Sequence, residues 1–286
     1  MRIGVEKREK LRERLEGVSG DVLVYEALRF YRPKKIAIAF SGGMDSLAMT
    51  LLVLDTVEML NWEGDVFIVF NNTTNEIPES LYYTRRMLRW FEDHFDVRSY
   101  EIMPKRHYAE FLLENFDKSA KMFLEGKWCK NAFRCCYYLK EKPSNDFYRK
   151  MGITMKFTGI RGLESWQRYL FARETLGIFD KGKIVHVMPL WNWTKKDVID
   201  FIENHPSNPP INPIYEMGFS GTGCMMCPIK FFYERSSLKA LKKYYPKAYE
   251  LGMALKLFFL EHHSRVKRIH DFDHPILRLA KKYVEG

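Results

Sequence analysis

A single uninterrupted run, residues 34–54, constrains the fold more than any other part of this sequence. In it the apolar stretch IAIAF leads directly into the hexapeptide SGGMDS, and a second apolar stretch, LAMTLLVL, follows. Gly42 and Gly43 let the backbone turn tightly and approach an anion with no Cβ in the way. The hydroxyl groups of Ser41 and Ser46, and the free N–H groups of the following helix, can meet phosphate oxygens. The run therefore predicts a buried strand, a phosphate-binding loop and a helix in immediate succession.

Strands and helices alternate after this loop. Apolar segments of strand length occur at residues 34–40, 65–70, 97–103, 155–160 and 183–190. Helical patterns occupy residues 44–62, 77–95 and 195–204. Thr194 and Asp197 predict a capping box at the start of the last of these helices. Apolar strands separated by amphipathic helices are typical of a parallel sheet covered on both faces.

We therefore expect an α/β protein with a doubly wound, mostly parallel sheet. The expected division is a helical N-terminal segment (1–32), a domain that carries the loop (33–228) and a helical, basic C-terminal extension (229–286). Because ligands of such sheets bind outside the carboxyl ends of the strands, the loop lies where a ligand is expected.

Charge is distributed unevenly along the chain. The formal net charge is +10, and residues 228–286 supply +7 of it, with thirteen Lys and Arg against six Asp and Glu. A basic surface attracts polyanions, which favours nucleic acid or a charged nucleotide as partner, and a solvated helical face is the alternative. No apolar stretch is long enough to span a membrane, and the start MRIGVEKREK lacks a signal-peptide core. We expect a cytoplasmic protein with no membrane partner.

The hexapeptide SGGMDS has no Walker A lysine, which excludes the GxxxxGK[ST] loop of ordinary ATPases. It resembles the SGGxDS loop, or PP-loop, of ATP pyrophosphatases and their relatives, which have a HUP-like α/β fold. The resemblance implies that Ser41, Gly42, Gly43, Asp45 and Ser46 bind an adenine nucleotide, with Asp45 also catalytic. If the nucleotide is ATP, magnesium is expected with it.

Four further segments resemble the phosphoadenylyl sulfate (PAPS/APS) reductase family. NNTTNEIPES is similar to DTGxxFPET, TGIRGLESWQR to TGxRxxESxxR, MPLWNWTKKDVIDFI to PLxxWTxxDVxxYI, and NPIYEMGFSGTGCMMCP to NPLYxxGFxxIGCxxC. In the first segment Asn72 and Thr74 replace the family's Asp and Gly. The resemblance spans residues 34–228 and implies further nucleotide-binding residues: Thr73, Gly159, Arg161, Glu164 and Ser165.

Two arginines of the second segment are candidate catalytic residues. Arg161 and Arg168 are seven positions apart, so both can lie on one helical face and grip a phosphate or sulfate group bidentately. Salt bridges on the surface are the alternative interpretation.

The cysteines indicate a metal site. Cys135-Cys136 and Cys224-x-x-Cys227 account for four of the five, and this pattern suits a reducing compartment and metal ligation better than disulfides. The pattern resembles the CC…CxxC arrangement of iron–sulfur adenylyl sulfate reductases, which implies that Cys135, Cys136, Cys224 and Cys227 hold a [4Fe–4S] cluster. Zinc is the alternative, because four thiolates also suit a closed tetrahedral site.

Cys129 is the fifth cysteine. If residues 128–139 form one helix, Cys129 lies about 10 Å along the axis from Cys136, too far to share one small cluster. If the helix starts later, Cys129 is an alternative ligand or a reactive, catalytic thiol.

The resemblance leaves three functions open. Reductases of this family use a C-terminal cysteine, whereas no cysteine follows Cys227 in this sequence; basic and aromatic residues follow instead, which can grip RNA. The first hypothesis is sulfur transfer, with ATP adenylating an acceptor such as a tRNA base and a sulfur donor as partner. The second is reduction of adenylyl or phosphoadenylyl sulfate to sulfite with a thiol reductant. The third is a nucleotide-binding or redox-sensing protein without catalysis. A homodimer is an open possibility for the assembly.

Overall fold

The computed structural model describes residues 17–111, 135–227, 230–231 and 235–264. The strands are β1 (Lys35–Ala39), β2 (Asp65–Asn71), β3 (Arg98–Ile102), β4 (Met155–Thr158), β5 (Ile178–Lys181) and β6 (Ile184–Val187). The α-helices are α2 (Gly20–Tyr31), α3 (Met44–Met59), α4 (Pro78–His94), α6 (Lys142–Met151), α7 (Trp166–Thr175), α8 (Lys195–Glu203), α10 (Arg235–Tyr244) and α11 (Pro246–Ser264). The short helices are η2 (Cys136–Glu141), η3 (Gly162–Glu164) and η4 (Pro213–Tyr215).

Contacts divide the chain into two compact units that alternate along the sequence. The first unit comprises Met1–Asn71, Tyr82–Ile102 and Asn145–Asn212, and the second comprises Asn72–Leu81, Met103–Ser144 and Pro213–Gly286.

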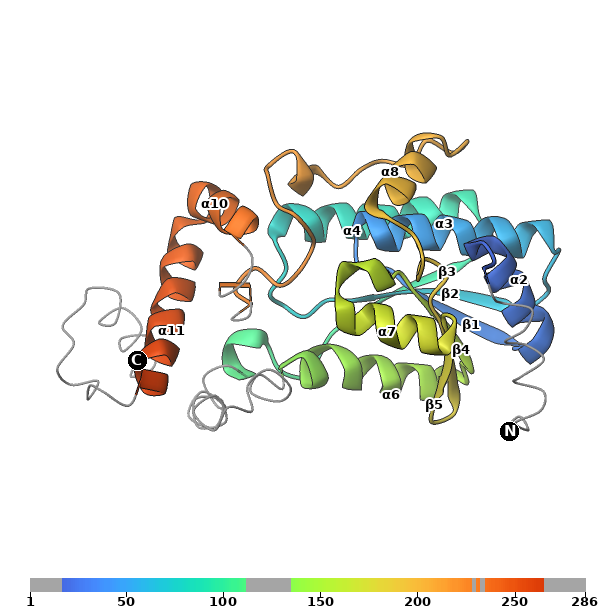
Figure 1. The fold of residues 1–286 in the computed structure, drawn as a ribbon, viewed down its shortest axis with the longest axis horizontal. Coiled ribbons are helices and arrows are strands. Elements are labelled where there is room, and N and C mark those ends of the chain that lie inside the picture. Colours follow the sequence, from blue (N-terminus) through green and yellow to red (C-terminus); the bar gives the residue numbers. More distant parts are fainter. Residues whose placement is uncertain (1–16, 112–134, 228–229, 232–234, 265–286) are drawn as a thin grey trace. The chain divides into compact units, whose positions relative to one another are not determined.

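The first unit is built on a six-stranded sheet with the order β3-β2-β1-β4-β6-β5 (Figure 1). All neighbouring strands pair in parallel except β5 and β6, which are antiparallel. The chain moves outward from β1 to β2 and β3, and then returns to place β4 on the other side of β1. The carboxyl ends of β1 and β4 are therefore the switch point of the sheet, where ligands of such folds bind. The doubly wound, mostly parallel α/β fold predicted from the sequence is confirmed.

Side chains of the strands alternate between the two faces of the sheet, and they are buried on both faces. Ala37, Phe67 and Val69 form one cluster with Tyr148 and Ile153, which come from α6 and the segment that follows it. The next residues along β1 point to the opposite face, because successive side chains of a strand alternate. Ile36 and Ile38 are fully buried on that face. Apolar strand sequences such as IAIAF are thus explained by burial from both sides.

Several local predictions agree with the structure. The first described helix, α2, ends at Arg32, which adopts a left-handed conformation (φ 45°) immediately before Pro33. Thr194 and Asp197 form the expected capping box of α8. The strand β5 was not expected, because its four residues follow a glycine and carry only two apolar side chains.

The described part of the second unit is mainly helical beyond residue 212. One of its core clusters contains Ile77, Ile214, Phe219, Phe231, Ala240 and Leu241. Gly252 of α11 lies directly against Phe231, since a Cβ at this position would be 1.9 Å from the ring. A second cluster packs Tyr108, Phe111 and Leu139 against Cys135 and Met226. This second cluster brings together two of the segments that carry cysteines.

Candidate functional site

The hexapeptide SGGMDS forms the tight turn after β1 and the first residues of α3. Gly42 has a φ of +76°, and a Cβ there would lie 2.1 Å from the hydroxyl oxygen of Thr84. Gly43 is the N-cap of α3, and no side chain caps this end of the helix. The first N–H groups of α3 have no intrahelical partner, and they carry the positive end of the helix dipole. The turn therefore has the backbone geometry of an anion-binding loop.

Side chains hold this loop in a defined shape. The backbone N–H and the hydroxyl of Ser41 both lie 3.1 Å from Ser46 Oγ, and the Ser46 hydroxyl donates to the carbonyl of Gly43 at 2.8 Å. From the other side, Asn212 Nδ2 donates to the carbonyl of Gly42 at 2.9 Å. Asn212 is the first residue of the motif NPIYEMGFSGTGCMMCP, but sequence reasoning assigned it no role, because its partner lies 170 positions away. The loop is thus organised without a ligand, which lowers the entropic cost of binding one.

Asp45 and Arg161 form an ion pair beside the loop. Asp45 lies in the first turn of α3, and Arg161 follows β4; its Nε donates to Asp45 Oδ1 at 2.9 Å. The Arg161 side chain is 12% exposed, and its Nη2 also lies 3.7 Å from Glu164 Oε1. The pair follows from the sheet order, since β1 and β4 are neighbours. It places a nearly buried cation next to the phosphate-binding turn.

The expected placement of Arg161 and Arg168 on one helical face is wrong. Arg161 precedes the 3-10 turn η3, and Arg168 lies in α7, whose N-cap Ser165 is extended (φ −158°, ψ 152°). An extended residue between the two positions breaks the helical repeat. Both arginines instead contact Glu164, which lies between them in the sequence. Ser165 has a structural role here, because its hydroxyl accepts from the Arg168 backbone N–H at 3.3 Å.

Gly159 allows the segment after β4 to pass close to the loop. A Cβ at Gly159 would lie 2.7 Å from the carbonyl oxygen of Asp45 and 3.0 Å from the Cα of Ser46. Both are backbone atoms, which cannot rotate away. The glycine is therefore needed for the approach that brings Arg161 to Asp45.

In the second unit, four cysteines gather around one buried tyrosine. Tyr108 is 3% exposed, and its hydroxyl donates to the carbonyl of Met226 at 2.7 Å. Burial raises the pKa of Tyr108, and the negative charges that Cys135, Cys227, Cys224 and Cys136 would carry as thiolates raise it further. The two cysteine pairs, far apart in the sequence, therefore lie within electrostatic range of a common residue.

Thr73 lies beside the CxxC segment. Its hydroxyl donates to Glu76 Oε1 at 2.7 Å and lies 3.4 Å from Cys224 Sγ. Burial and then Glu76 raise the pKa of Cys224 to about 11, while the Thr73 contact acts in the opposite direction. The structure thus places Thr73, expected near the nucleotide, against a cysteine.

Cys136 is the first residue of the π-helix η2, and Cys135 is its N-cap. A hydrogen bond between their side chains raises the pKa of Cys135 and lowers the pKa of Cys136 to about 6, with Lys140 contributing to the lowering. One thiolate stabilised by an adjacent thiol and a lysine is the ionised form that metals and electrophiles require. Cys129, the alternative ligand or catalytic thiol, lies outside the described residues.

Asn75 holds the turn between Cys224 and Cys227. Its backbone carbonyl accepts from the Met225 N–H at 2.6 Å, and its Oδ1 accepts from the Met226 N–H at 3.2 Å. Its Nδ2 is buried and has no hydrogen-bond partner within the described residues. A buried amide N–H without a partner costs free energy unless an acceptor is present. This donor therefore fits a site that receives an acceptor group, such as the sulfur atoms of a metal centre.

The donor set suits a cluster or zinc, but its geometry is not that of a bound metal. In the part of the chain that the structure describes, no group of three or more His, Cys, Asp or Glu side chains is arranged to hold a metal ion. The soft thiol donors, the stabilised thiolate and the unpaired Asn75 amide are consistent with such a centre. The ligand set therefore stays a proposal.

The fold and the loop define an α/β protein of the PP-loop class. A domain model described as "Phosphoadenosine phosphosulfate reductase domain" matches residues 35–230. The chain therefore belongs to the phosphoadenosine phosphosulfate reductase domain family, as its motifs predicted.

Two curated relatives are similar to parts of this chain. An uncharacterised protein of Methanocaldococcus jannaschii is 25% identical over 81% of this chain and 43% of its own length. An adenosine 5′-phosphosulfate reductase of Salinibacter ruber is 30% identical over 40% of this chain and 42% of its own length. This chain thus spans less than half the length of these curated relatives.

A solved structure supports the fold. The phosphoadenylyl-sulfate reductase of Candida auris, in a phosphate complex, covers 78% of this chain and 97% of its own, with a TM-score of 0.54 and 19% identity. Among the described residues, none of the helices combines the length and the apolar character that crossing a bilayer requires.

Proposed function

We propose that this protein is an enzyme that activates a substrate with an adenine nucleotide at SGGMDS and transfers sulfur with the help of its cysteine centre. The observation that carries the proposal is the packing of Cys135 and of Met226, which lies between Cys224 and Cys227, against one cluster that contains Tyr108. Nucleotide binding alone would need none of these thiols. Their proximity therefore favours sulfur chemistry over nucleotide binding alone.

The loop residues bind and orient the nucleotide phosphates. The N–H groups at the start of α3 donate to phosphate oxygens, and Ser41 and Ser46 can redirect their hydroxyl groups from each other to the ligand. Arg161 supplies positive charge beside the nucleotide phosphates bound at SGGMDS, while Asp45 and Glu164 hold its guanidinium in place. With ATP as the nucleotide, Mg²⁺ would accompany the phosphates.

The four cysteines would hold a [4Fe–4S] cluster, with zinc as the alternative metal. If only three cysteines were ligands, such a cluster would leave one iron open, and that iron could hold a sulfide for transfer. Asn75 and Thr73 orient the segment that carries Cys224. The hydrophobic cluster of Tyr108, Phe111 and Leu139 limits access of water to Cys135.

The reaction that we favour is thiolation of a tRNA base. A carbonyl oxygen of the base attacks the α-phosphorus of ATP, and pyrophosphate leaves. A sulfide from the sulfur donor then adds to the activated carbon, and AMP leaves with the original oxygen. The first step needs the phosphates fixed at SGGMDS, because charge develops on the departing pyrophosphate.

Basic and aromatic residues of the second unit favour RNA as the acceptor. In α10 and α11, Lys243 lies 4.7 Å from the ring centre of Tyr244, and Lys242 lies 5.8 Å from that of Tyr249. Lys242, Lys243 and Tyr244 are exposed. Such pairs can contact phosphates and stack on unpaired bases.

The second candidate is reduction of adenylyl or phosphoadenylyl sulfate to sulfite. It is favoured by the similarity to adenosine 5′-phosphosulfate reductases. In that reaction sulfur gains two electrons from a pair of thiols, which become a disulfide, and the adenosine phosphate leaves. A thiol reductant would be the partner, and Cys129 or an external thiol would attack the sulfur.

One experiment separates these candidates. Protein purified without oxygen is analysed for iron, zinc and its visible spectrum, and is then incubated either with ATP, sulfide and tRNA or with adenylyl sulfate and a dithiol. We expect iron and thiolated tRNA with AMP and pyrophosphate. Sulfite without thiolated tRNA would identify the reductase, and nucleotide binding without product would identify a non-catalytic protein.

Cysteine variants provide the matched controls. Cys224→Ser is expected to lose metal and activity together, whereas Cys129→Ser should keep the metal. Full activity and metal content in Cys224→Ser would refute the proposed ligand set. We also propose that the protein acts in the cytoplasm and assembles as a homodimer; cell fractionation and light scattering test these two points.

A further inference from the structure

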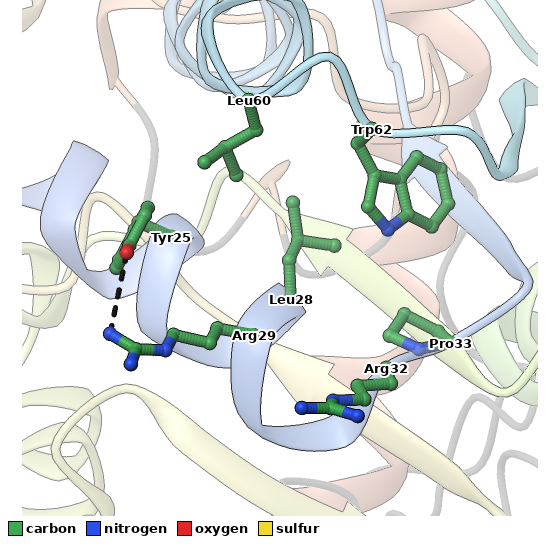
Figure 2. A pocket seen from close by; sticks show the side chains of 7 residues that line it. All are labelled: Tyr25, Leu28, Arg29, Arg32, Pro33, Leu60 and Trp62. Atoms are coloured by element: carbon green, nitrogen blue, oxygen red, sulfur yellow. Dashed lines mark hydrogen bonds between the residues drawn. The ribbon is translucent and has the colours of Figure 1, made fainter.

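An open cavity of about 400 Å³ lies in the first unit, at the ends of α2 and α3. Its lining residues, drawn in Figure 2, are Tyr25, Leu28, Arg29, Arg32, Pro33, Leu60 and Trp62. None of them belongs to SGGMDS or to the cysteine segments. The volume is within the range of small-ligand pockets.

This cavity is separate from the phosphate-binding loop. The helix α3 has 16 residues; it begins directly after Gly43 of the loop, and its C-cap is Leu60 of the cavity. At 1.5 Å per residue, the two ends of this helix are about 24 Å apart. One nucleotide cannot occupy both places, so the cavity requires its own explanation.

Hydrogen-bond donors dominate the polar part of the lining. The Arg29 guanidinium lies 3.4 Å from the Tyr25 hydroxyl, and Arg32 is exposed at the end of α2. Within the described residues neither arginine forms an ion pair with a carboxylate. Figure 2 shows the indole nitrogen of Trp62 directed toward the side of the cavity where Leu28 and Pro33 lie. A helix C-terminus attracts cations, which explains the arginines in part but not the donor on Trp62.

The remaining lining is apolar and firmly held. Leu28 and Pro33 are buried, and Leu60 and Trp62 are half-buried. A Cβ at Gly64 would lie 2.0 Å from the Trp62 ring, so the indole rests directly on the backbone of Gly64. A fixed aromatic wall beside an apolar floor suits a flat ring system.

We propose that this cavity is a second nucleotide site, in which a base lies against Trp62 and a phosphate binds to Arg29 and Arg32. Donors without carboxylate partners select an anion, and the aromatic wall selects a flat ring on the same ligand. The ligand is either a free mononucleotide or one nucleotide of an RNA chain. The site is independent of the proposed sulfur transfer.

The test observes Trp62 directly. Protein containing 5-fluorotryptophan is titrated with AMP, with a short single-stranded RNA and with inorganic phosphate, while ¹⁹F NMR follows the Trp62 resonance, assigned by its loss in Trp62→Phe. We expect a saturable shift with AMP or RNA, and at least about tenfold weaker binding of phosphate. Saturation by AMP would identify a free mononucleotide as the ligand of the cavity. RNA binding at least about tenfold tighter than AMP binding would identify an RNA chain as the ligand.

Variants define the controls. Arg29→Gln combined with Arg32→Asn should weaken binding at least about tenfold, since both cations are lost. Asparagine is chosen at position 32 because it tolerates the left-handed backbone. Arg89→Gln, an exposed arginine on α4, should bind as the wild type, and Arg161→Gln should leave the Trp62 response intact even if it abolishes binding at SGGMDS. The proposal is overturned by no saturable shift, by equal affinity for phosphate and AMP, or by unchanged binding in the double variant.

Discussion

Arg161 donates a hydrogen bond from Nε to the Asp45 carboxylate at 2.9 Å, which joins two segments 116 positions apart. Asp45 lies in the first turn of α3, and Arg161 follows the neighbouring strand β4. The contact ties the cation to the loop at the switch point of the sheet.

Arg161→Gln is expected to weaken binding of ATP or adenylyl sulfate at least about tenfold, because a fixed cation beside the phosphates is lost. The free energy of unfolding should fall by only about 1 kcal/mol, since Asp45 is partly exposed and water replaces its partner. Equilibrium dialysis and urea unfolding measure the two effects. Arg173→Gln, an exposed arginine of α7, is the control; equal nucleotide affinity in both variants would contradict a role for Arg161.

Gly159→Ala is expected to destabilise the protein by about 2 kcal/mol, because the new methyl group meets the backbone of Asp45 and Ser46. Nucleotide affinity should fall as well, since the loop must shift. Gly221→Ala adds the same methyl group where no atom lies within 4 Å, and it should change stability by less than about 0.5 kcal/mol. Thermal unfolding of the two variants is the measurement, and similar melting temperatures would refute the argument.

Asn75→Ala is expected to lower the affinity of the cysteine centre for Co²⁺ about tenfold, because the turn between Cys224 and Cys227 loses the oxygen that accepts from Met226. Asn75→Asp keeps that oxygen but replaces the N–H donor by a charged carboxylate oxygen, so the Co²⁺ affinity of this variant should lie between those of Asn75→Ala and the wild type. Absorption in the thiolate-to-cobalt band reports binding without any need for activity. Wild-type affinity in Asn75→Ala would show that the turn holds its shape alone.

His186 is expected to make stability depend on pH. Burial, with Lys156 and Lys181 nearby, lowers the pKa of His186 to about 3, whereas its pKa in the unfolded chain is about 6.5. The unfolded state therefore binds a proton at a higher pH than the folded state does. The contribution to stability is constant above pH 6.5, and it is lost as the pH falls toward 3, by up to about 1.4 kcal/mol per pH unit.

His186→Phe should remove this part of the slope, because phenylalanine does not titrate and can fill the place beside Phe179. Urea unfolding of both proteins between pH 7 and about pH 4 measures the difference. Parallel stability curves for the two proteins would contradict the assignment to His186.

Sequence alone was sufficient for the features that are local. The strand, the turn and the helix around SGGMDS depend on neighbouring residues, because glycine geometry and helix capping act over a few positions. The capping box of α8 was predictable for the same reason. The family was also predictable, since its motifs are short and occur in order.

The tertiary structure decided which distant residues meet. Arg161 reaches Asp45 because β4 pairs with β1. The seven-residue spacing of Arg161 and Arg168 had suggested one helical face, but the extended backbone of Ser165 interrupts the helix between them. Asn75 holds the turn before Cys227 through hydrogen bonds across about 150 positions, which no local pattern encodes. Local preferences set the elements of this protein, whereas strand order and long-range hydrogen bonds determine its sites.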